Sequence, residues 1–355
     1  MYTHPAQAVA GVITAGTLLL AAQSVFAIGS ASAATPAATV IAPPASAPAT
    51  DPAIPAPALQ QAEELTEIVV HSTEPRFVLP TRRDQIGRIW APVYINGQGP
   101  FRLVLDSGAN HSGITAQVAQ TLGLPLDSTQ QVMLRGVTGS AAVPTVRVES
   151  FSVGDLQEGA ERLPIVIDAL GGAEGILGTD RMQNRRISID FRHDRISIAR
   201  SKGEHAEAGY RVIPFETMRG NLLVVDASVG GVRTKAIIDT GGQVTIANLA
   251  LRAALEHRRA QLRGTVTQIE GVTTDIQAAA EISTPPLHIG GVDADGGSIE
   301  IRYRNVSYGD MKIFEHWRLT DEPAMLVGMD ALGWLDTLVI DYRRHELQIR
   351  MRDTG

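Results

Sequence analysis

The hydrophobic positions beyond Arg76 fall in short aliphatic runs that glycine, asparagine and aspartate residues interrupt. Runs of this length, bounded by turn-forming residues, are typical of β-strands. The clearest examples are Trp90–Ile95, Phe101–Leu105, Val143–Val148, Ile187–Ile189 and Ile196–Ile198. Two segments, Thr115–Leu122 and Ala247–Leu262, are the candidates for helices. The pattern therefore predicts an all-β fold, mainly antiparallel, with a few short helices.

The same short motifs occur twice along the chain, in the same order, which indicates a duplication. The matched pairs are Phe101–Gly108 with Thr234–Gly241, Leu134–Thr138 with Ile269–Thr273, Phe151–Asp155 with Val306–Asp310, Ile176–Asp180 with Leu326–Asp330, and Ile189–Arg192 with Ile340–Arg343. We expect one half at about 76–202 and the other at about 209–352, connected by Ser201–Gly209. The second half is longer, and we interpret its extra segment Leu287–Ser298 as an inserted hairpin.

The first charged residue of the chain is Asp51, and the apolar run Ala8–Ala27 precedes it. Small residues at sites such as Val25–Ala27 suit signal-peptide cleavage, although the start carries no Lys or Arg. We interpret residues 1–33 as a signal peptide, or as a membrane anchor if the run stays uncleaved. The Ala/Pro-rich residues 34–66 are predicted to be a disordered linker. The expected location is therefore the periplasm or the exterior of the cell.

The composition argues against several classes of partner and cofactor. The net charge of -7 and the lack of a long Lys/Arg run argue against nucleic acid as a partner. The chain has no Cys, which excludes disulfides, thiolate catalysis and iron–sulfur clusters. The nine His residues show no zinc-site spacing, and Asp293–Gly297 lacks the rest of an EF-hand loop. We therefore expect neither a metal nor another cofactor.

Each half contains an aliphatic strand that ends in Asp-Ser/Thr-Gly, at Asp106 and at Asp239. In a duplicated chain these two triplets are expected to face each other across a pseudo-two-fold axis. Two carboxyl groups held a few ångströms apart share one proton, because both cannot ionise cheaply. Such a pair can activate a water molecule against a peptide carbonyl group, one carboxylate acting as base and the other carboxyl as acid.

The segments Asp106–Ile114 and Asp239–Ile246 resemble the active-site signatures of retropepsin-like aspartic proteases. Ile176–Gly178 and Leu326–Gly328 resemble the family's hydrophobic-hydrophobic-Gly motif. The resemblance covers about 88–350 and implies the acid-protease fold, with two pseudo-symmetric β-barrel lobes fused in one chain, as in the bacterial single-chain form. It also implies a monomer that binds an extended polypeptide substrate.

Carried over to this sequence, the resemblance makes Asp106 and Asp239 the catalytic pair. It implies that Ser107 and Thr240 lock the two loops together, with Gly108 and Gly241 beside them, and that Ser112 and Thr245 support the carboxylates. Flap hairpins that cover the substrate are expected at Gly136, Val137 and Thr138, and at Gly271, Val272 and Thr273. We expect Asp180 and Asp330 to cap short helices. Three features depart from the family pattern: Gly242 where Ala is usual, the titratable neighbour His111, which we expect at the rim of the site, and flap tips without Tyr.

The sequence thus predicts an exported aspartic endopeptidase. Two other functions stay open: a non-catalytic peptide-binding or assembly module on the same fold, and a two-carboxylate glycosidase, which the 5% aromatic content disfavours. Residues 60–86 could act as a pro-segment that blocks the cleft.

Overall fold

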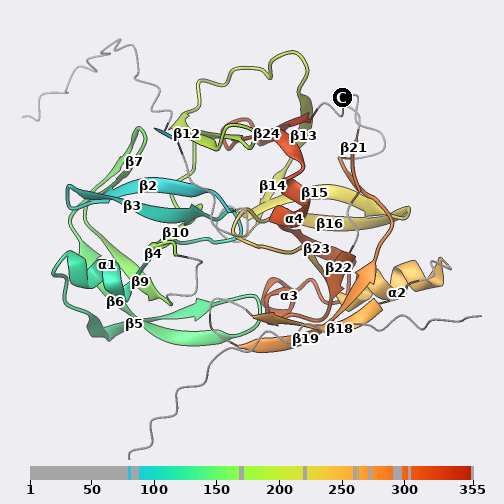
Figure 1. Cartoon of the computed structure of the whole chain (residues 1–355), viewed down its shortest axis with the longest axis horizontal. Coiled ribbons are helices and arrows are strands. Elements are labelled where there is room, and N and C mark those ends of the chain that lie inside the picture. The colour runs from blue at the N-terminus through green and yellow to red at the C-terminus, as the bar shows by residue number, and fades with distance from the viewer. Residues whose placement is uncertain are drawn as a thin grey trace, which may run out of the picture. The chain divides into compact units, whose positions relative to one another are not determined.

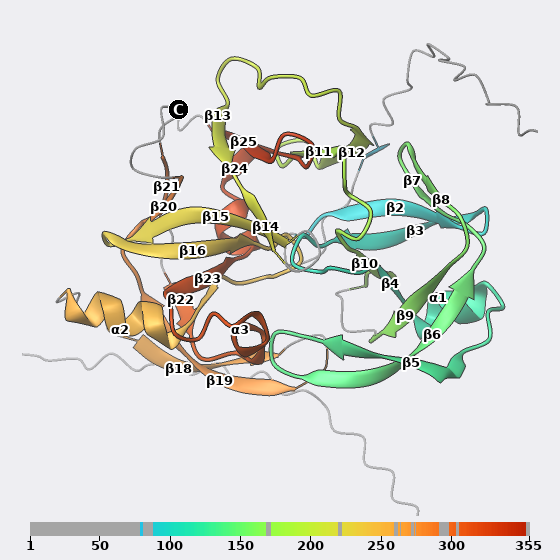
Figure 2. The same cartoon turned by 180° about the vertical axis from the view of Figure 1, so that it is seen from behind.

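A computed structural model describes residues 79–80, 88–167, 172–218, 222–258, 262, 264–270, 273, 275–290, 298–302 and 305–352. These residues form three sheets and four short helices (Figures 1 and 2), so the all-β expectation is confirmed. The segments interpreted as signal peptide and linker, and most of the possible pro-segment, lie outside the described residues. In the described part of the chain, no helix is both long and apolar enough to cross a membrane.

The first sheet has nine strands in the order β5-β6-β9-β4-β10-β3-β2-β7-β8. Along β2 the side chains alternate between buried and more exposed positions, as expected for a strand with one face on a core, whereas β4 and β10 are buried throughout. The bounds are β2 (Trp90–Ile95), β3 (Gln98–Leu105), β4 (Gly113–Thr115), β5 (Asp127–Arg135), β6 (Ser140–Val148), β7 (Phe151–Val153), β8 (Leu156–Glu158), β9 (Glu161–Val166) and β10 (Gly175–Leu177).

The second sheet has ten strands, and nine of them follow the order β18-β19-β22-β17-β23-β16-β15-β20-β21. The bounds are β14 (Glu216–Met218), which pairs with β15, then β15 (Leu222–Val229), β16 (Val232–Ile238), β17 (Ile246–Ala247), β18 (Gly264–Glu270), β19 (Ile276–Ser283), β20 (Leu287–Ile289), β21 (Ile299–Ile301), β22 (Asn305–Tyr308) and β23 (Ala324–Val327). Both sheets place the equivalent strands in the same sequence order. In both, the strand that ends at the Asp triplet runs parallel to the strand of the hydrophobic-hydrophobic-Gly motif.

This topology corrects one of the five matched pairs. Phe151–Asp155 starts the hairpin β7–β8, which pairs with β2, whereas Val306–Asp310 begins in β22, which pairs with β19 and β17. The true counterpart of β7–β8 is β20–β21, which pairs with β15. Leu287–Ser298 is therefore not an inserted hairpin. It is the equivalent hairpin with a longer connection between its two strands.

A third sheet, called here the joining sheet, has the order β1-β12-β11-β24-β25-β13 and combines strands from both halves of the sequence. Its central contact is an antiparallel ladder of β11 with β24, from Arg186 opposite Asp341 to Asp190 opposite Thr337. Asp341 is fully buried and accepts hydrogen bonds from Ser201 Oγ and from Arg186. The bounds are β1 (Leu79–Pro80), β11 (Arg185–Asp190), β12 (Arg195–Arg200), β13 (Arg211–Pro214), β24 (Leu335–Asp341) and β25 (Glu346–Met351).

The helices are α1 (Ala116–Thr121), α2 (Leu249–His257), α3 (Lys312–Trp317) and α4 (Met329–Leu332). The two helices expected from the sequence exist, but α2 ends at His257, five residues before Leu262. Their starts are fixed by side-chain caps, because Thr115 accepts a hydrogen bond from Val118 N and Asn248 accepts one from Leu251 N. α3 lies between β22 and β23, and the sequence pattern did not predict it.

The hydrophobic core has one large cluster, with members from all three sheets. A second cluster joins β15, β16 and β23 to Phe314 and Trp317 of α3. The corresponding cluster in the first sheet is smaller, with Val104 and Ile176 among its members. The cluster of the second sheet is therefore larger than that of the first sheet, because it includes side chains of α3.

Candidate active site

Both aspartates of the repeated triplet stand at the end of a buried strand. Asp106 follows β3, and its backbone N–H donates to Leu177 O of β10 at 3.0 Å. Asp239 follows β16, and its N–H donates to Val327 O of β23, also at 3.0 Å. Because each aspartate is held by the parallel neighbour of its own strand, its position is set by the sheet rather than by the loop.

The two triplets meet. The carboxyl groups of Asp106 and Asp239 lie close enough to influence each other's pKa directly. Each triplet glycine lies against the other carboxyl group: a Cβ atom added to Gly241 would stand 2.2 Å from Asp106 Cγ, and one added to Gly108 would stand 2.7 Å from Asp239 Oδ1. Glycine at these two places is therefore required for the close approach of the loops. Asp239 is 7% exposed, whereas Asp106 is half-buried.

Ser107 and Thr240 join the two loops by reciprocal hydrogen bonds. Ser107 Oγ donates to Ile238 O at 2.7 Å and accepts from Thr240 N at 3.1 Å. Thr240 Oγ1 donates to Leu105 O at 2.7 Å and accepts from Ser107 N at 3.0 Å. Both hydroxyl groups are buried. These four bonds fix the distance between the loops that carry the carboxyl groups.

Burial raises the pKa of both carboxyl groups, because the charged form loses its hydration. The negative charge of Asp239 raises the pKa of Asp106 further, so that this pKa lies well above the ordinary range of an aspartate. Asp239 accepts hydrogen bonds from Gly241 N and Gly242 N and faces the charge of Arg88, which all lower its pKa. The pair therefore resists losing both of its protons.

Ser112 and Thr245 lie beside the loops but do not bind the carboxyl pair. Ser112 Oγ donates to Asp180 at 2.9 Å and accepts from Gly178 N, and Thr245 Oγ1 donates to Asp330 at 2.6 Å and accepts from Gly328 N. The expected helix cap is wrong for Asp180, because no helix follows it among the described residues. Asp330 is not the N-cap of α4, which is Gly328, but it lies in the first turn of that helix and accepts a hydrogen bond from Ala331 N at 2.8 Å. Both aspartates instead anchor the chain that leaves the triplet.

His111 stands at the edge of this arrangement, as the sequence suggested. Its ring is 71% exposed, and Nδ1 lies 3.5 Å from Asp180 Oδ2. The hydrogen bond to Asp180 raises the pKa of the imidazole. The ring thus contacts the aspartate that anchors the loop.

The first predicted flap is the hairpin of β5 and β6, and its tip is docked on the second half of the chain. Val137 O accepts a hydrogen bond from Ile313 N of α3 at 3.2 Å, and the Val137 side chain packs against the second cluster. Gly139 lies so close to Asp275 that an added Cβ would be 1.8 Å from Asp275 Oδ2. Gly136 and Thr138 are buried in this contact.

The second predicted flap is the hairpin of β18 and β19, which pair from Gly264 opposite Ile282 to Glu270 opposite Ile276. The described part of its tip includes Thr273 and Asp275, whereas Gly271 and Val272 lie outside the described residues. Asp275 connects this hairpin with the first one through its contact with Gly139.

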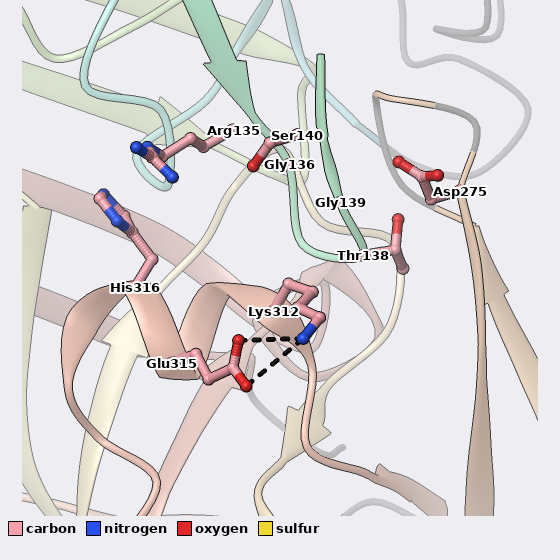
Figure 3. Close-up of a pocket in the computed structure, with 9 residues that line it drawn as sticks. All are labelled: Arg135, Gly136, Thr138, Gly139, Ser140, Asp275, Lys312, Glu315 and His316. Carbon is pink, nitrogen blue, oxygen red and sulfur yellow. Dashed lines mark hydrogen bonds and ion pairs between the residues drawn. The ribbon is translucent and has the colours of Figure 1, made fainter.

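A cavity of about 560 Å³ lies between the tip of the first hairpin, α3 and Asp275 (Figure 3). Arg135 and His316 face each other at one end of it, and Asp275 stands at the other. Lys312 and Glu315 of α3 form an ion pair at 3.0 Å along its wall. Neither Asp106 nor Asp239 lines this cavity, so it belongs to the hairpin contact rather than to the carboxyl pair.

We expect Val137→Asp to release the first hairpin from α3. The change places a charge against the second cluster and removes apolar contact that contributes roughly 1–2 kcal/mol. Because opening exposes the Arg135–Gly136 bond, limited trypsin digestion is expected to cut there about ten times faster. Val132→Asp is the matched control, since Val132 lies on the same hairpin and is already 43% exposed. Equal cutting rates in the two variants would show that the docked tip contributes no protection.

The sequence did not single out three residues that the structure places at the site. Ile313 and Asp275 hold the first hairpin, and no local pattern marks either of them. Arg88 is buried beside the carboxyl pair. Arg88 stands two residues before the strand expected at Trp90–Ile95, which the structure pairs with β3.

A sequence model of the aspartyl protease family matches residues 91–181, the region that holds Asp106, the first hairpin and Gly178. No curated protein matches the chain in a sequence comparison. Among the described residues, no group of three or more His, Cys, Asp and Glu side chains could hold a metal ion. The family match supports a protease hydrolase in general terms.

Proposed function

We propose that this protein is an aspartic endopeptidase whose active site is built from two fused retropepsin-like lobes, one on each half of the chain. The observation that carries the proposal is the close approach of Asp106 and Asp239, which stand at equivalent positions of two sheets with the same strand order. The match of residues 91–181 to the aspartyl protease family supports the assignment for the first lobe. The same strand order in the second sheet supports the same assignment for the second lobe.

In the proposed mechanism a water molecule binds between the two carboxyl groups. Asp239, the ionised partner, takes a proton from the water as its oxygen attacks the peptide carbonyl carbon, and Asp106 donates its proton to the carbonyl oxygen. The tetrahedral intermediate then collapses. Asp239 gives its proton to the leaving nitrogen, and Asp106 recovers one from the hydroxyl group of the intermediate. The pair ends in its starting state, without a metal or cofactor.

The substrate is proposed to be a polypeptide in extended conformation, because a cleft between a sheet surface and β-hairpins binds a peptide as an added strand. Entry requires the first hairpin to leave α3, since its tip is held there by Val137. The apolar run Ala8–Ala27 supports export to the periplasm or beyond. The presence of both aspartates in one chain supports a monomer.

The experiment incubates the purified protein with unfolded casein and with a peptide library between about pH 3 and pH 8, the range in which a coupled carboxyl pair titrates. Cleavage with a bell-shaped pH dependence, blocked by a statine-type inhibitor, is the expected result. Folded protein that binds peptides but cuts none of them at any pH would contradict the proposal and favour the non-catalytic binding module.

A further inference from the structure

The cavity between the first hairpin, α3 and Asp275 lies on the face of β5 that is turned away from the Asp106 loop. Leu134 of β5 packs against the smaller cluster of the first sheet, as does Ala109 of that loop. Because successive side chains of a strand point to opposite faces, Arg135 points the other way. Arg135 pairs with Ser140 across the hairpin, and both residues line the cavity. The cavity is therefore a separate place from the carboxyl pair.

The charges that line this cavity are separated along it (Figure 3). Arg135 and His316 stand at one end, and Asp275 stands at the other. Lys312 and Glu315 on the wall form an ion pair at 3.0 Å and so neutralise each other. Within the described part of the chain, neither Arg135 nor Asp275 has an ion-pair partner. The cavity therefore offers a cation at one end and a carboxylate at the other.

A buried hydroxyl group at the tip of the first hairpin has no hydrogen-bond partner among the described residues. It belongs to Thr138, which is 3% exposed and lines the cavity. In Figure 3 its oxygen points towards the end at which Asp275 stands. A buried hydroxyl group without a partner is costly, because it has given up its hydrogen bonds to water. A ligand with a hydrogen-bond donor at this end satisfies it.

We propose that this cavity binds a short peptide with free termini, two or three residues long. The carboxylate group of the peptide pairs with Arg135, because a guanidinium group can hold a carboxylate by two parallel hydrogen bonds. The ammonium group pairs with Asp275 and donates to Thr138 Oγ1. The volume of about 560 Å³ lies in the ordinary range of sites for small ligands.

A peptide bound in this way holds the first hairpin closed. The walls of the cavity come from the hairpin tip, from α3 and from Asp275, so the cavity is complete only while the tip is docked on α3. A ligand that binds only the docked state shifts the population towards that state. With the peptide at about ten times its Kd, opening of the hairpin falls about tenfold. Slower entry of substrate is a consequence that rests on the proposed function, whereas the binding itself does not.

The first test measures the binding of trialanine to the purified protein by isothermal titration calorimetry. Acetyl-trialanine lacks the ammonium group, and trialanine amide lacks the carboxylate group. Arg135→Gln and Asp275→Asn each remove the partner at one end of the cavity. Arg233→Gln and Asp226→Asn, at exposed positions of β16 and β15, are the matched controls.

We expect trialanine to bind the wild type with a Kd below about 1 mM. Each blocked peptide and each of the two cavity variants should weaken binding about tenfold or more, because each loses one charged hydrogen bond. Trialanine amide should bind Arg135→Gln as well as it binds the wild type, and acetyl-trialanine should bind Asp275→Asn as well as it binds the wild type. These two equalities assign each end of the peptide to its partner.

The second test follows trypsin cleavage after Arg135 with and without trialanine. At a peptide concentration of about ten times the wild-type Kd, cutting of the wild type should slow about tenfold. At the same concentration, cutting of Asp275→Asn should slow only about twofold, because its Kd is higher.

A failure of trialanine to bind at about 10 mM, or equal affinities of the free and blocked peptides, would overturn the inference. Binding that ignores both Arg135→Gln and Asp275→Asn would also overturn it, because the peptide then lies elsewhere. A protein that binds trialanine as expected but cuts no polypeptide would support this inference and contradict only the proposed function.

Discussion

We expect the replacement of either Asp106 or Asp239 with Asn to reduce the rate of peptide cleavage by about a thousandfold or more. An amide can neither take a proton from water nor donate one to the carbonyl oxygen, and each of these proton transfers contributes about 10²–10⁴ in rate. Cleavage of a fluorogenic peptide at the optimum pH measures the loss. Asp226→Asn is the matched control, because Asp226 is exposed on β15 and outside the site. A variant at either carboxyl position that retained activity would disprove the shared mechanism.

The Asp106→Asn variant should also be more stable than the wild type at neutral pH. Since burial raises the pKa of Asp106, the unfolded chain loses this proton at lower pH than the folded one does. The wild type therefore loses stability as the pH rises from the ordinary pKa of an aspartate to the raised value. Below that window both states keep the proton, and the two proteins should differ little. Thermal unfolding at about pH 3 and pH 7 compares them without reference to activity.

Thr240→Ala is expected to have the largest effect on stability among single changes at the site. It leaves Ser107 N and Leu105 O without their hydrogen-bond partner in a buried place, and each lost bond costs about 1–3 kcal/mol. We expect a loss of about 2–5 kcal/mol in the free energy of unfolding, measured in urea, together with reduced activity because the loops lose their fixed spacing.

Thr240→Ser is the control, because it keeps the hydroxyl group and removes only a methyl group. Stability equal to that of Thr240→Ala would show that the cross-loop bonds contribute little. The double change Ser107→Ala with Thr240→Ala should cost less than the sum of the two single changes, since both hydroxyl groups belong to one hydrogen-bonded unit.

The sequence predicted correctly those features that a few neighbouring residues determine. The short apolar run bounded by turn-forming residues predicted β2 with its bounds at Trp90 and Ile95. The repeated triplets identified Asp106 and Asp239, which the structure brings together, because a strand end and a glycine turn are both encoded in a few residues.

The features that the sequence could not provide depend on contacts between distant segments. Val306–Asp310 resembles Phe151–Asp155 by composition alone, and only strand pairing shows that β22 corresponds to β9 instead. The docking of Val137 on Ile313 joins residues 176 positions apart through a backbone hydrogen bond, which leaves no trace in residue type. The partners of Ser112 and Thr245 were missed for the same reason, since Asp180 and Asp330 follow them by 68 and 85 positions.

The joining sheet has a consequence for the chain as a whole. The ladder between β11 and β24 covers the backbone groups of both strands, and each strand comes from a different half. A chain that stopped after Arg200 would leave β11 as an open edge with Ile187 and Ile189 on it, a ready template for pairing with further copies. Holding both halves in one polypeptide therefore also protects this protein against aggregation, because each half closes the exposed edge of the other as the chain folds.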